Sequence, residues 1–333
     1  MENRFWSISI AGVLIVELIL FGIVSPDFIN LQNLLASTEN FIPAGMMALS
    51  MAIVIITGGI DLSVGSMMSL CGVVMGILWQ HGINIWIAAL LSVVLGAVLG
   101  WINGLIIVRT GIQPLIATLA TLFIYGSLAM VLVGQGSGSI YGFPQAYLNL
   151  GSGTILKIFP IQLLVYVVLS LLFGFLLQFT SYGRQVYFIG NNEGAALYSG
   201  LRVARVKMLA YVLSGCMSGV AAIFMGAYFA SVRGDMGANY ELTVITACLV
   251  GGVNVFGGSG TILGTVLGTL LLGMLQQGLN MLNVSSVEQS IVTGIILVMA
   301  VGLQQLSGLL SRRRRVEDRN HASVLDPATA ARD

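Results

Sequence analysis

The stretch IITGGIDLSVGS, from Ile55 to Ser66, places an aspartate among glycines at the end of a long apolar run. A second stretch, GGVNVFGGS from Gly251 to Ser259, repeats the pattern 193 positions later, with Asn254 where the first has Asp61. Each stretch follows one apolar run and precedes another, and paired glycines permit irregular backbone. The sequence therefore predicts two repeat-related halves, each with a broken or short helix at its glycine-rich motif.

Composition indicates that lipid surrounds most of the chain. The 333 residues are 57% hydrophobic and only 8% charged, whereas a soluble protein has roughly 25% charged residues. Glycine is frequent, with 42 residues, and small residues let membrane helices approach closely. Two glycine ladders spaced by four predict close helix packing, with contact to a second chain as the alternative. Their members are Gly96, Gly100, Gly104, Gly260, Gly264 and Gly268.

Apolar runs predict the membrane spans. A spanning helix needs about 20 mostly apolar residues, and about ten runs approach that length. They are Phe5–Val24, Phe41–Thr57, Ser66–Gln80, Ile85–Val108, Pro114–Val133, Ile161–Phe179, Val206–Phe229, Leu242–Val253, Gly260–Leu279 and Val287–Leu306. The third and eighth runs are short and adjoin the glycine-rich motifs. We therefore expect an all-α polytopic membrane protein, with a transmembrane domain over residues 1–310 and a basic, disordered cytoplasmic tail over 311–333.

Charge placement predicts the orientation, because lysine and arginine collect on cytoplasmic loops. With the N-terminus inside and alternating spans, only Lys157 and Arg233 of the 14 lysines and arginines fall outside. Both termini are thus predicted to be cytoplasmic. The run Arg312–Arg315 is interpreted as an anchor at the inner face rather than a nucleic-acid patch, and the net charge of +1 also indicates no nucleic-acid partner. Pro26–Asn40 and Gly134–Pro160 are predicted to be outer loops, the first lying on the membrane surface.

Catalytic and nucleotide-binding motifs are missing from the sequence. Neither lysine belongs to a GxxxxGK[ST] phosphate loop, and no HExxH or GxSxG pattern occurs. The two histidines, His81 and His321, have no neighbouring ligands in the sequence, so we expect no metal site. The chain has no visible means of hydrolysing ATP, so it is interpreted as non-catalytic.

Asp61 and Asn254 can have either of two roles. Their side-chain oxygens can accept hydrogen bonds from free backbone N–H groups or cap the next helix. Alternatively they form part of a gate, because ionisable groups within a membrane often mark a transport path. The sequence leaves both interpretations open.

Other polar side chains inside the spans are candidates for lining such a path. A sugar-like substrate would need hydrogen-bonding groups and aromatic faces, but hydrogen bonds between helices explain any one of these residues equally well. The candidates are Asn103, Gln113, Thr118, Tyr125, Gln276 and Gln277.

The inner loop TSYGRQVYFIGNNEGAALYSGLRVARVK, from Thr180 to Lys207, contains a predicted short helix. Asn192 can cap its start, Glu193 suits its positive N-terminus, and Gly200 can end it in the left-handed conformation. A helix of about two turns is unstable alone in water, so it needs a surface to dock on. A groove on a partner protein is one solution, and the membrane surface is the other.

This loop resembles the coupling-helix segment of ribose-type ABC importer permeases, a monosaccharide family. The matching residues are Gly183, Arg184, Gly190, Asn191, Asn192, Glu193, Ala195, Ala196, Ser199, Gly200 and Val203. The stretches GGIDLSVGS and GGVNVFGGSGTILGT are also similar to that family's signatures, and the resemblance extends from about Phe28 to Val301. One difference is that Asn191 follows Gly190, where the family's usual loop has two adjacent glycines.

The resemblance implies an ATP-driven importer in the bacterial inner membrane. In such an importer, a periplasmic solute-binding protein delivers the substrate, two permeases form the path, and two ABC ATPase chains grip the coupling helices. ATP and Mg²⁺ bind the ATPase, and this chain binds no cofactor. Stretches such as YGFPQAY and GMLQQGLNML most resemble the permeases that import autoinducer-2, which implies a second, non-identical permease, although ribose and rhamnose permeases share most of these motifs.

Two other functions remain possible from the sequence. A secondary transporter driven by protons or sodium would need a titratable group near the bilayer midplane, and Glu17 is the candidate by position. An intramembrane enzyme would need histidine, serine or cysteine constellations, and their absence from the sequence argues against it.

Overall fold

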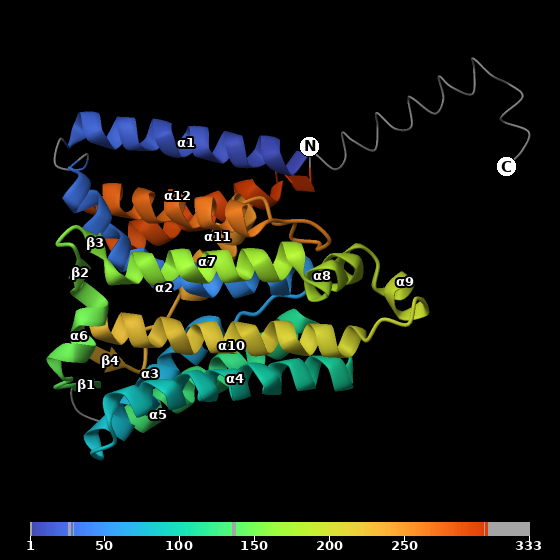
Figure 1. Ribbon diagram of the computed structural model, residues 1–333, viewed down its shortest axis with the longest axis horizontal. Coiled ribbons are helices and arrows are strands. Elements are labelled where there is room, and N and C mark those ends of the chain that lie inside the picture. Colours follow the sequence, from blue (N-terminus) through green and yellow to red (C-terminus); the bar gives the residue numbers. More distant parts are fainter. Residues whose placement is uncertain (1, 26–27, 29, 135–137, 303, 306–333) are drawn as a thin grey trace, which may run out of the picture.

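The structure is a computed structural model that describes residues 2–25, 28, 30–134, 138–302 and 304–305. Long helices run roughly side by side, with short strands at one end of the bundle (Figure 1). The elements are α1 (Glu2–Val24), α2 (Leu31–Ile56), α3 (Val64–Gln80), α4 (Ile85–Thr110), α5 (Pro114–Val133), β1 (Ser139–Tyr141), α6 (Gln145–Ser152), β2 (Thr154–Ile155), β3 (Phe159–Pro160), α7 (Ile161–Phe179), α8 (Ser181–Asn191), α9 (Glu193–Tyr198), α10 (Val203–Tyr228), β4 (Ser231–Arg233), α11 (Tyr240–Val250) and α12 (Ile262–Met281).

Within the described residues, six helices are long and apolar enough to cross a membrane: α2, α4, α5, α7, α10 and α12. Shorter apolar helices accompany them, namely Ile8–Val24 within α1, α3, α11 and Ser286–Gly302. The all-α polytopic membrane class is therefore confirmed. The short helices α3 and α11 adjoin the two glycine-rich motifs, as the sequence predicts. The count of about ten spans stays a prediction, as do the two repeat-related halves.

Helix α2 forms the centre of the bundle. Helices α7, α10, α11 and α12 pack around it. Every residue from Met46 to Ile56 is completely buried, so this half of α2 contacts only protein. A helix enclosed on all sides can be apolar around its whole circumference, and Ser50 is the sole polar residue of this half of α2.

The predicted start of α2 at Phe41 is wrong, and so is the separate outer loop over Pro26–Asn40. The helix begins ten residues earlier, at Leu31. Asn30 caps this start, because its side chain accepts the Gln32 N–H at 3.0 Å. Thr38 and Glu39, which lie in the first half of this longer helix, are buried within the protein.

Helices α4 and α10 approach each other through glycines. A Cβ added at Gly96 would collide with the Gly215 carbonyl oxygen, and one added at Gly100 would collide with the Tyr211 carbonyl oxygen. The second ladder packs α12 closely against α11, because a Cβ at Gly268 of α12 would collide with the Ala247 carbonyl oxygen of α11. Both glycine stripes thus pack helices within this chain, as the first of the two interpretations predicts.

The segment Gly134–Pro160, predicted as an outer loop, contains regular structure. Strand β1 pairs antiparallel with β4, with Ile140 opposite Val232, and β2 pairs with β3. Helix α6 carries Tyr147, which is completely buried and donates a hydrogen bond to the Ile223 carbonyl of α10 at 2.8 Å. The segment is therefore anchored on the bundle by its aromatic side chains.

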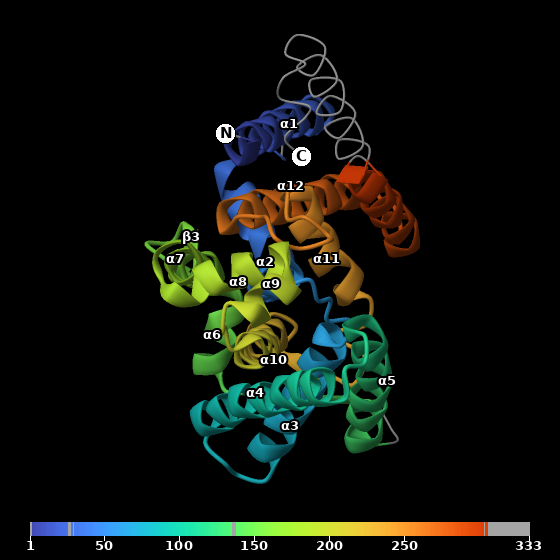
Figure 2. The same ribbon diagram turned by 90° about the vertical axis from the view of Figure 1, so that its right-hand side faces the viewer.

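The two ends of the bundle differ. The N-terminus of α1 lies at the same end as α8 and α9, which we call the α9 end, and strands β1–β4 with α6 lie at the opposite strand end (Figure 1). Viewed from the α9 end, α8 and α9 lie between α10 and α12 (Figure 2). The predicted tail over 311–333, with Arg312–Arg315 and His321, lies outside the described residues.

Candidate functional site

The first glycine-rich motif forms the turn between α2 and α3. Gly58 has a left-handed φ of 82°, and the Gly59 N–H bonds to the Val54 carbonyl at 3.0 Å, which closes α2 as a Schellman-type cap. Asp61 follows and is completely buried. Its Oδ1 accepts the Ser63 N–H at 3.0 Å and the Ser63 hydroxyl at 2.7 Å. The turn thus holds a carboxylate inside the protein with donors of its own.

Side chains from three helices complete a polar cluster around this carboxylate. Ser214 of α10 donates to Asp61 Oδ2 at 2.8 Å. Asn103 of α4 donates from Nδ2 to the Ser63 hydroxyl oxygen at 2.7 Å, and Tyr125 of α5 donates to Asn103 Oδ1 at 3.2 Å. We call Asp61, Ser63, Asn103, Tyr125 and Ser214 the Asp61 cluster. It links the first glycine-rich turn to α4, α5 and α10.

The structure brings four predicted path candidates together at this place: Asp61, Asn103, Thr118 and Tyr125. The Thr118 hydroxyl bonds to the Ile60 carbonyl at 3.2 Å, directly beside the turn. All four are buried. Hydrogen bonding between helices accounts for each of them, and their role in a path stays a prediction.

The three predicted glutamines lie elsewhere. Gln113 directly precedes α5 and is exposed, so its expected position inside a span is wrong, while its role in a path stays a prediction. Gln276 and Gln277 are half-buried on α12, which packs against α1, α2 and α11 rather than against the helices of the Asp61 cluster.

The second glycine-rich motif uses the same two devices after α11. Gly252 has a φ of 83°, and the Val253 N–H bonds to the Cys248 carbonyl at 3.0 Å. Asn254, which is half-buried, then accepts the Phe256 N–H at 3.0 Å through Oδ1. Asp61 and Asn254 therefore both accept a hydrogen bond from the backbone two residues on.

The spacing within the two motifs differs by one residue. The left-handed caps correspond at Gly58 and Gly252, 194 positions apart, whereas the side-chain turns correspond at Asp61 and Asn254, 193 positions apart. The surroundings differ as well, because only the first turn carries a fully buried carboxylate. The motifs are related turns with different polar environments.

Helix α9 is the helix predicted in the inner loop. Asn192 Oδ1 accepts the Ala195 N–H at 2.9 Å at its start. Gly200 has a φ of 77° at its end, and the Leu201 N–H bonds to the Ala196 carbonyl at 3.1 Å. Both predicted caps are therefore present, around a helix of six residues.

We call Asn192–Gly200 the α9 knob, because it protrudes from the α9 end (Figure 1). The side chain of Leu197 is 58% exposed and that of Tyr198 is 96% exposed. Ala196 is completely buried beneath them, so it is not part of the exposed surface. An ion pair of 2.7 Å between Glu193 and Lys207 ties the knob to α10. The remaining members Asn192, Gly194, Ala195, Ser199 and Gly200 are exposed.

Helix α8 was not predicted from the sequence. The Thr180 hydroxyl oxygen accepts the Gly183 N–H at 3.3 Å, which caps its start. Gly183 is packed so tightly that a Cβ there would collide with the Leu177 carbonyl, while Arg184 is exposed. The signals were present, because a threonine cap precedes two buried apolar residues three positions apart, Val186 and Ile189.

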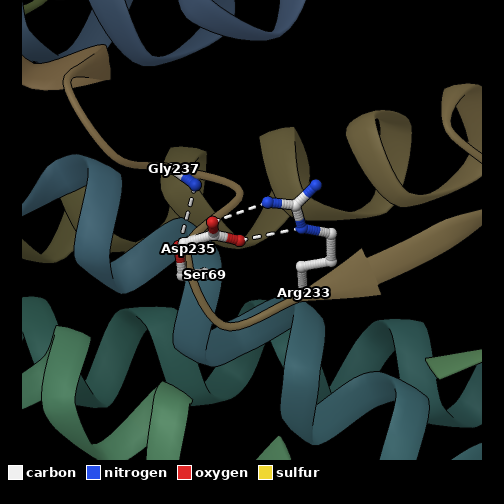
Figure 3. Close-up of polar contacts among 4 residues, drawn as sticks. All are labelled: Ser69, Arg233, Asp235 and Gly237. Carbon is white, nitrogen blue, oxygen red and sulfur yellow. Dashed lines mark hydrogen bonds and ion pairs between the residues drawn. The ribbon is translucent and has the colours of Figure 1, made fainter. Parts of the chain in front are cut away.

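A cavity of about 300 Å³ opens at the strand end. On one wall Arg233 forms a two-point ion pair with Asp235, from Nε at 2.9 Å and from a terminal nitrogen at 2.6 Å (Figure 3). This bond lowers the pKa of Asp235 below its usual value. The Gly237 N–H bonds to Ser69 of α3 at 2.8 Å, which fixes the following loop on the bundle (Figure 3). The lining residues are Met130, Val133, Gly134, Gly138, Ser139, Arg233 and Asp235.

Comparison with known proteins gives the family. Residues 33–301 match the family described as branched-chain amino acid transport system, permease component. The chain is 40% identical to the autoinducer 2 import system permease protein LsrD of Yersinia enterocolitica, and 38% identical to LsrD of Salmonella paratyphi A. Each match covers 89% of this chain and 90% of the relative. No solved structure matches the chain.

The family description and the names of the relatives cite different cargoes, so membership establishes the role of permease rather than the substrate. The match extends from the beginning of α2 to the last described helix and includes both glycine-rich motifs and the α9 knob. The resemblance to ABC importer permeases is thereby confirmed. This chain belongs to the permease-component family of these transport systems, and within it is a non-catalytic, multi-pass membrane subunit.

Proposed function

We propose that this chain is the transmembrane permease subunit of an ATP-driven importer that carries autoinducer-2 or a related small sugar across the bacterial inner membrane. The support is the identity of 38–40% to permeases named for autoinducer-2 import over nearly the whole chain. Ribose, rhamnose and other monosaccharides are the alternative cargoes.

The α9 knob is the observation that carries the proposal. It offers Leu197 and Tyr198 to the surroundings, and large apolar side chains on a protruding helix mark a contact site. A six-residue helix is unstable in isolation, but caps at both ends and the Glu193–Lys207 ion pair hold it in position before any partner arrives. A groove on an ABC ATPase subunit is its partner, and ATP and Mg²⁺ bind there rather than on this chain.

The remaining partners follow from the same arrangement. The N-terminus and the α9 knob share one end, which we assign to the cytoplasm together with the C-terminal tail over 311–333. The strand end then faces the periplasm and receives the solute-binding protein. A second, non-identical permease and membrane lipid cover the apolar faces of α4, α5 and α7, and about ten spans in two halves form the path.

In this proposal the Asp61 cluster and the Asn254 turn form the inner gate. ATP-driven closure of the ATPases moves the knob, and the permeases alternate between outward and inward states. The cluster suits a gate because hydrogen bonds join its turn to α4, α5 and α10, so these parts have to move together. Gln276 and Gln277 remain candidates for the path on α12.

The test is substitution of the exposed tyrosine on the knob. Tyr198→Ala removes a side chain that supports nothing within this chain, so we expect normal membrane insertion with reduced ATPase co-purification and reduced uptake. Glu193→Lys places two cations together at Lys207 and should act in the same direction. Tyr141→Ala, which changes another exposed tyrosine at the strand end, is the matched control. Normal uptake and ATPase retention in both knob variants would contradict the proposal.

A second candidate function rests on Glu17. This residue of α1 is only 9% exposed, and among the described residues neither of its carboxylate oxygens has a hydrogen-bond partner. Buried carboxylates in membrane helices are typical of ion-coupled transporters. If Glu17→Gln abolishes uptake while removal of the partner ATPase has no effect, the ion-coupled function is correct. We expect the reverse.

The cargo is tested by uptake of labelled autoinducer-2, ribose and rhamnose in cells that lack this chain. Restoration of autoinducer-2 uptake alone by the complementing chain is the expected result. Restoration of ribose or rhamnose uptake instead would replace the cargo and leave the permease role intact.

A further inference from the structure

The last turn of α8 is bonded directly to the second glycine-rich motif. Tyr187 Oη donates to the Gly260 carbonyl at 2.7 Å, and Asn191 Nδ2 donates to the Gly258 carbonyl at 3.2 Å. Burial raises the pKa of Tyr187 to about 12, so its hydroxyl remains a donor at neutral pH. Two side chains of one helical turn thus hold two carbonyls of the same loop.

That loop is in turn bonded to the end of α2. The Gly258 N–H donates to the Ile56 carbonyl at 2.9 Å. Ile56 is the last residue of α2, where helix carbonyls lack partners within the helix. The two glycine-rich motifs are therefore bonded to each other, and α8 is bonded to the second motif and, through Gly258, linked to the first. We call Ile56, Tyr187, Gly190, Asn191, Gly258 and Gly260 the α8 junction.

The α8 junction is closely packed at its glycines. A Cβ added at Gly190 would collide with the Ile56 carbonyl and lie 2.5 Å from the Gly258 nitrogen. Gly257 and Gly258 have φ values of 88° and 76°, which L side chains rarely adopt. Backbone therefore contacts backbone, so α8 can push on the two motifs directly, whereas movement of α8 away from them is transmitted only through the Tyr187 and Asn191 hydrogen bonds.

The α9 knob follows this junction directly in the chain. Helix α8 ends at Asn191 and α9 begins at Glu193. Asn192 between them is bonded on both sides, because its N–H donates to the Phe188 carbonyl and its own carbonyl accepts the Ala196 N–H. The two helices thus form a bonded unit, and a force on the knob reaches the junction directly.

We propose that Tyr187 and Asn191 are positioning residues that transmit movement of the α9 knob to both glycine-rich turns at once. The inference rests on the proposed function and assigns its transmission route. A knob that moves without these two bonds still binds and stimulates the ATPase, but it no longer moves the inner ends of α2 and α11 together. The consequence is ATP hydrolysis without matching import.

The experiment measures substrate imported per ATP hydrolysed. The complete complex of both permeases, ATPase and solute-binding protein is reconstituted in liposomes with Tyr187→Phe, Asn191→Ala or both. We expect the ratio to fall by about two- to tenfold for each single variant, as for loss of one hydrogen bond, and further for the double variant. The amount of bound ATPase should stay unchanged. Tyr182→Phe is the matched control, because that hydroxyl of α8 bonds to Val206 of α10 at 3.3 Å instead.

Each outcome decides the inference. A lower ratio in the junction variants with a normal ratio in Tyr182→Phe supports it. Wild-type ratios in both junction variants overturn it. The inference is also overturned if the import-to-hydrolysis ratio falls equally in Tyr182→Phe, or if the complex fails to assemble in both junction variants. In either case the bonds would serve only the stability of α8. Failure of the proposed function is separate, since the wild-type complex itself would then lack bound ATPase or ATP-driven import.

Discussion

Substitution of Asp61 should separate the hydrogen-bonding role of this residue from its charge. The carboxylate accepts three hydrogen bonds, two from Ser63 and one from Ser214, and is completely buried. Alanine removes all three acceptor interactions. The two hydroxyl groups can rotate toward other acceptors, but the Ser63 backbone N–H cannot.

The magnitude follows from that difference. One buried N–H without an acceptor costs about 1–3 kcal/mol, and two lost hydroxyl bonds add about 0.5–1.5 kcal/mol each. Asp61→Ala should therefore lower the free energy of unfolding by about 2–6 kcal/mol. Asp61→Asn keeps an oxygen for Ser63, and its amide can donate to the Ser214 oxygen. The loss of charge-assisted bonds is offset by the smaller desolvation of a neutral group, so its effect should stay within about 1 kcal/mol.

The assay is thermal unfolding of the purified chain in detergent. The measured quantity is the fraction of protein that remains monodisperse after heating. Ser214→Ala, which removes one donor, should fall between the two Asp61 variants. The predicted order of stability is therefore wild type and Asp61→Asn together, then Ser214→Ala, then Asp61→Ala. If Asp61→Ala were as stable as Asp61→Asn, the hydrogen-bond account of the cluster would be refuted.

Three other predictions concern packing and charge. Gly215→Leu should prevent α4 and α10 from approaching and abolish monodisperse protein in size-exclusion chromatography, whereas Gly174→Ala on α7, where a Cβ meets nothing within 4 Å, should have no effect. Ala196→Trp should displace α9 by overpacking, at a cost of about 1–3 kcal/mol, and lower ATPase co-purification; unchanged co-purification would contradict the burial of this residue. The pKa of Asp235 is lowered by Arg233, so stability from this pair is present above the usual value of 3.8 and is lost as pH falls through the lower folded value. The thermal stability that wild type gains over Asp235→Asn should therefore be constant above about pH 5 and shrink as pH falls below 3.8, and a gain that does not shrink there would argue against this ion pair.

The sequence predicted those features that depend on neighbouring residues. Each apolar run coincides with a helix, because spans are set by the length of contiguous apolar sequence. The caps of α9 at Asn192 and Gly200 were also predicted, since capping acts over three or four residues. The start of α2 was predicted wrongly, although the capping residue Asn30 is a local signal that marks the correct start.

Helix α8 and the strands after α5 were missed for a different reason. Their segments are short and polar enough to be interpreted as loops, and their stability comes from distant contacts. Tyr147 of α6 is held by the Ile223 carbonyl of α10, and β1 finds its partner in β4. Propensity is a weak guide where tertiary packing supplies the stability.

By itself the sequence determined the membrane class, the order of the apolar helices, the two glycine-rich turns and the short capped helix of the inner loop, because these depend on hydropathy and on caps within a few residues. Only the tertiary structure decided which polar residues meet. Asn103 reaches Ser63 over 40 positions, and Ser214 reaches Asp61 over 153. It also decided that Ala196 is buried, and that α8 is bonded to the second glycine-rich loop and through it linked to the end of α2. The physical reason is that glycine has no side chain. Glycines therefore let α4 approach α10, and let α8 approach the glycine-rich turns, until backbone contacts backbone. This close approach decides which polar side chains come within hydrogen-bonding distance.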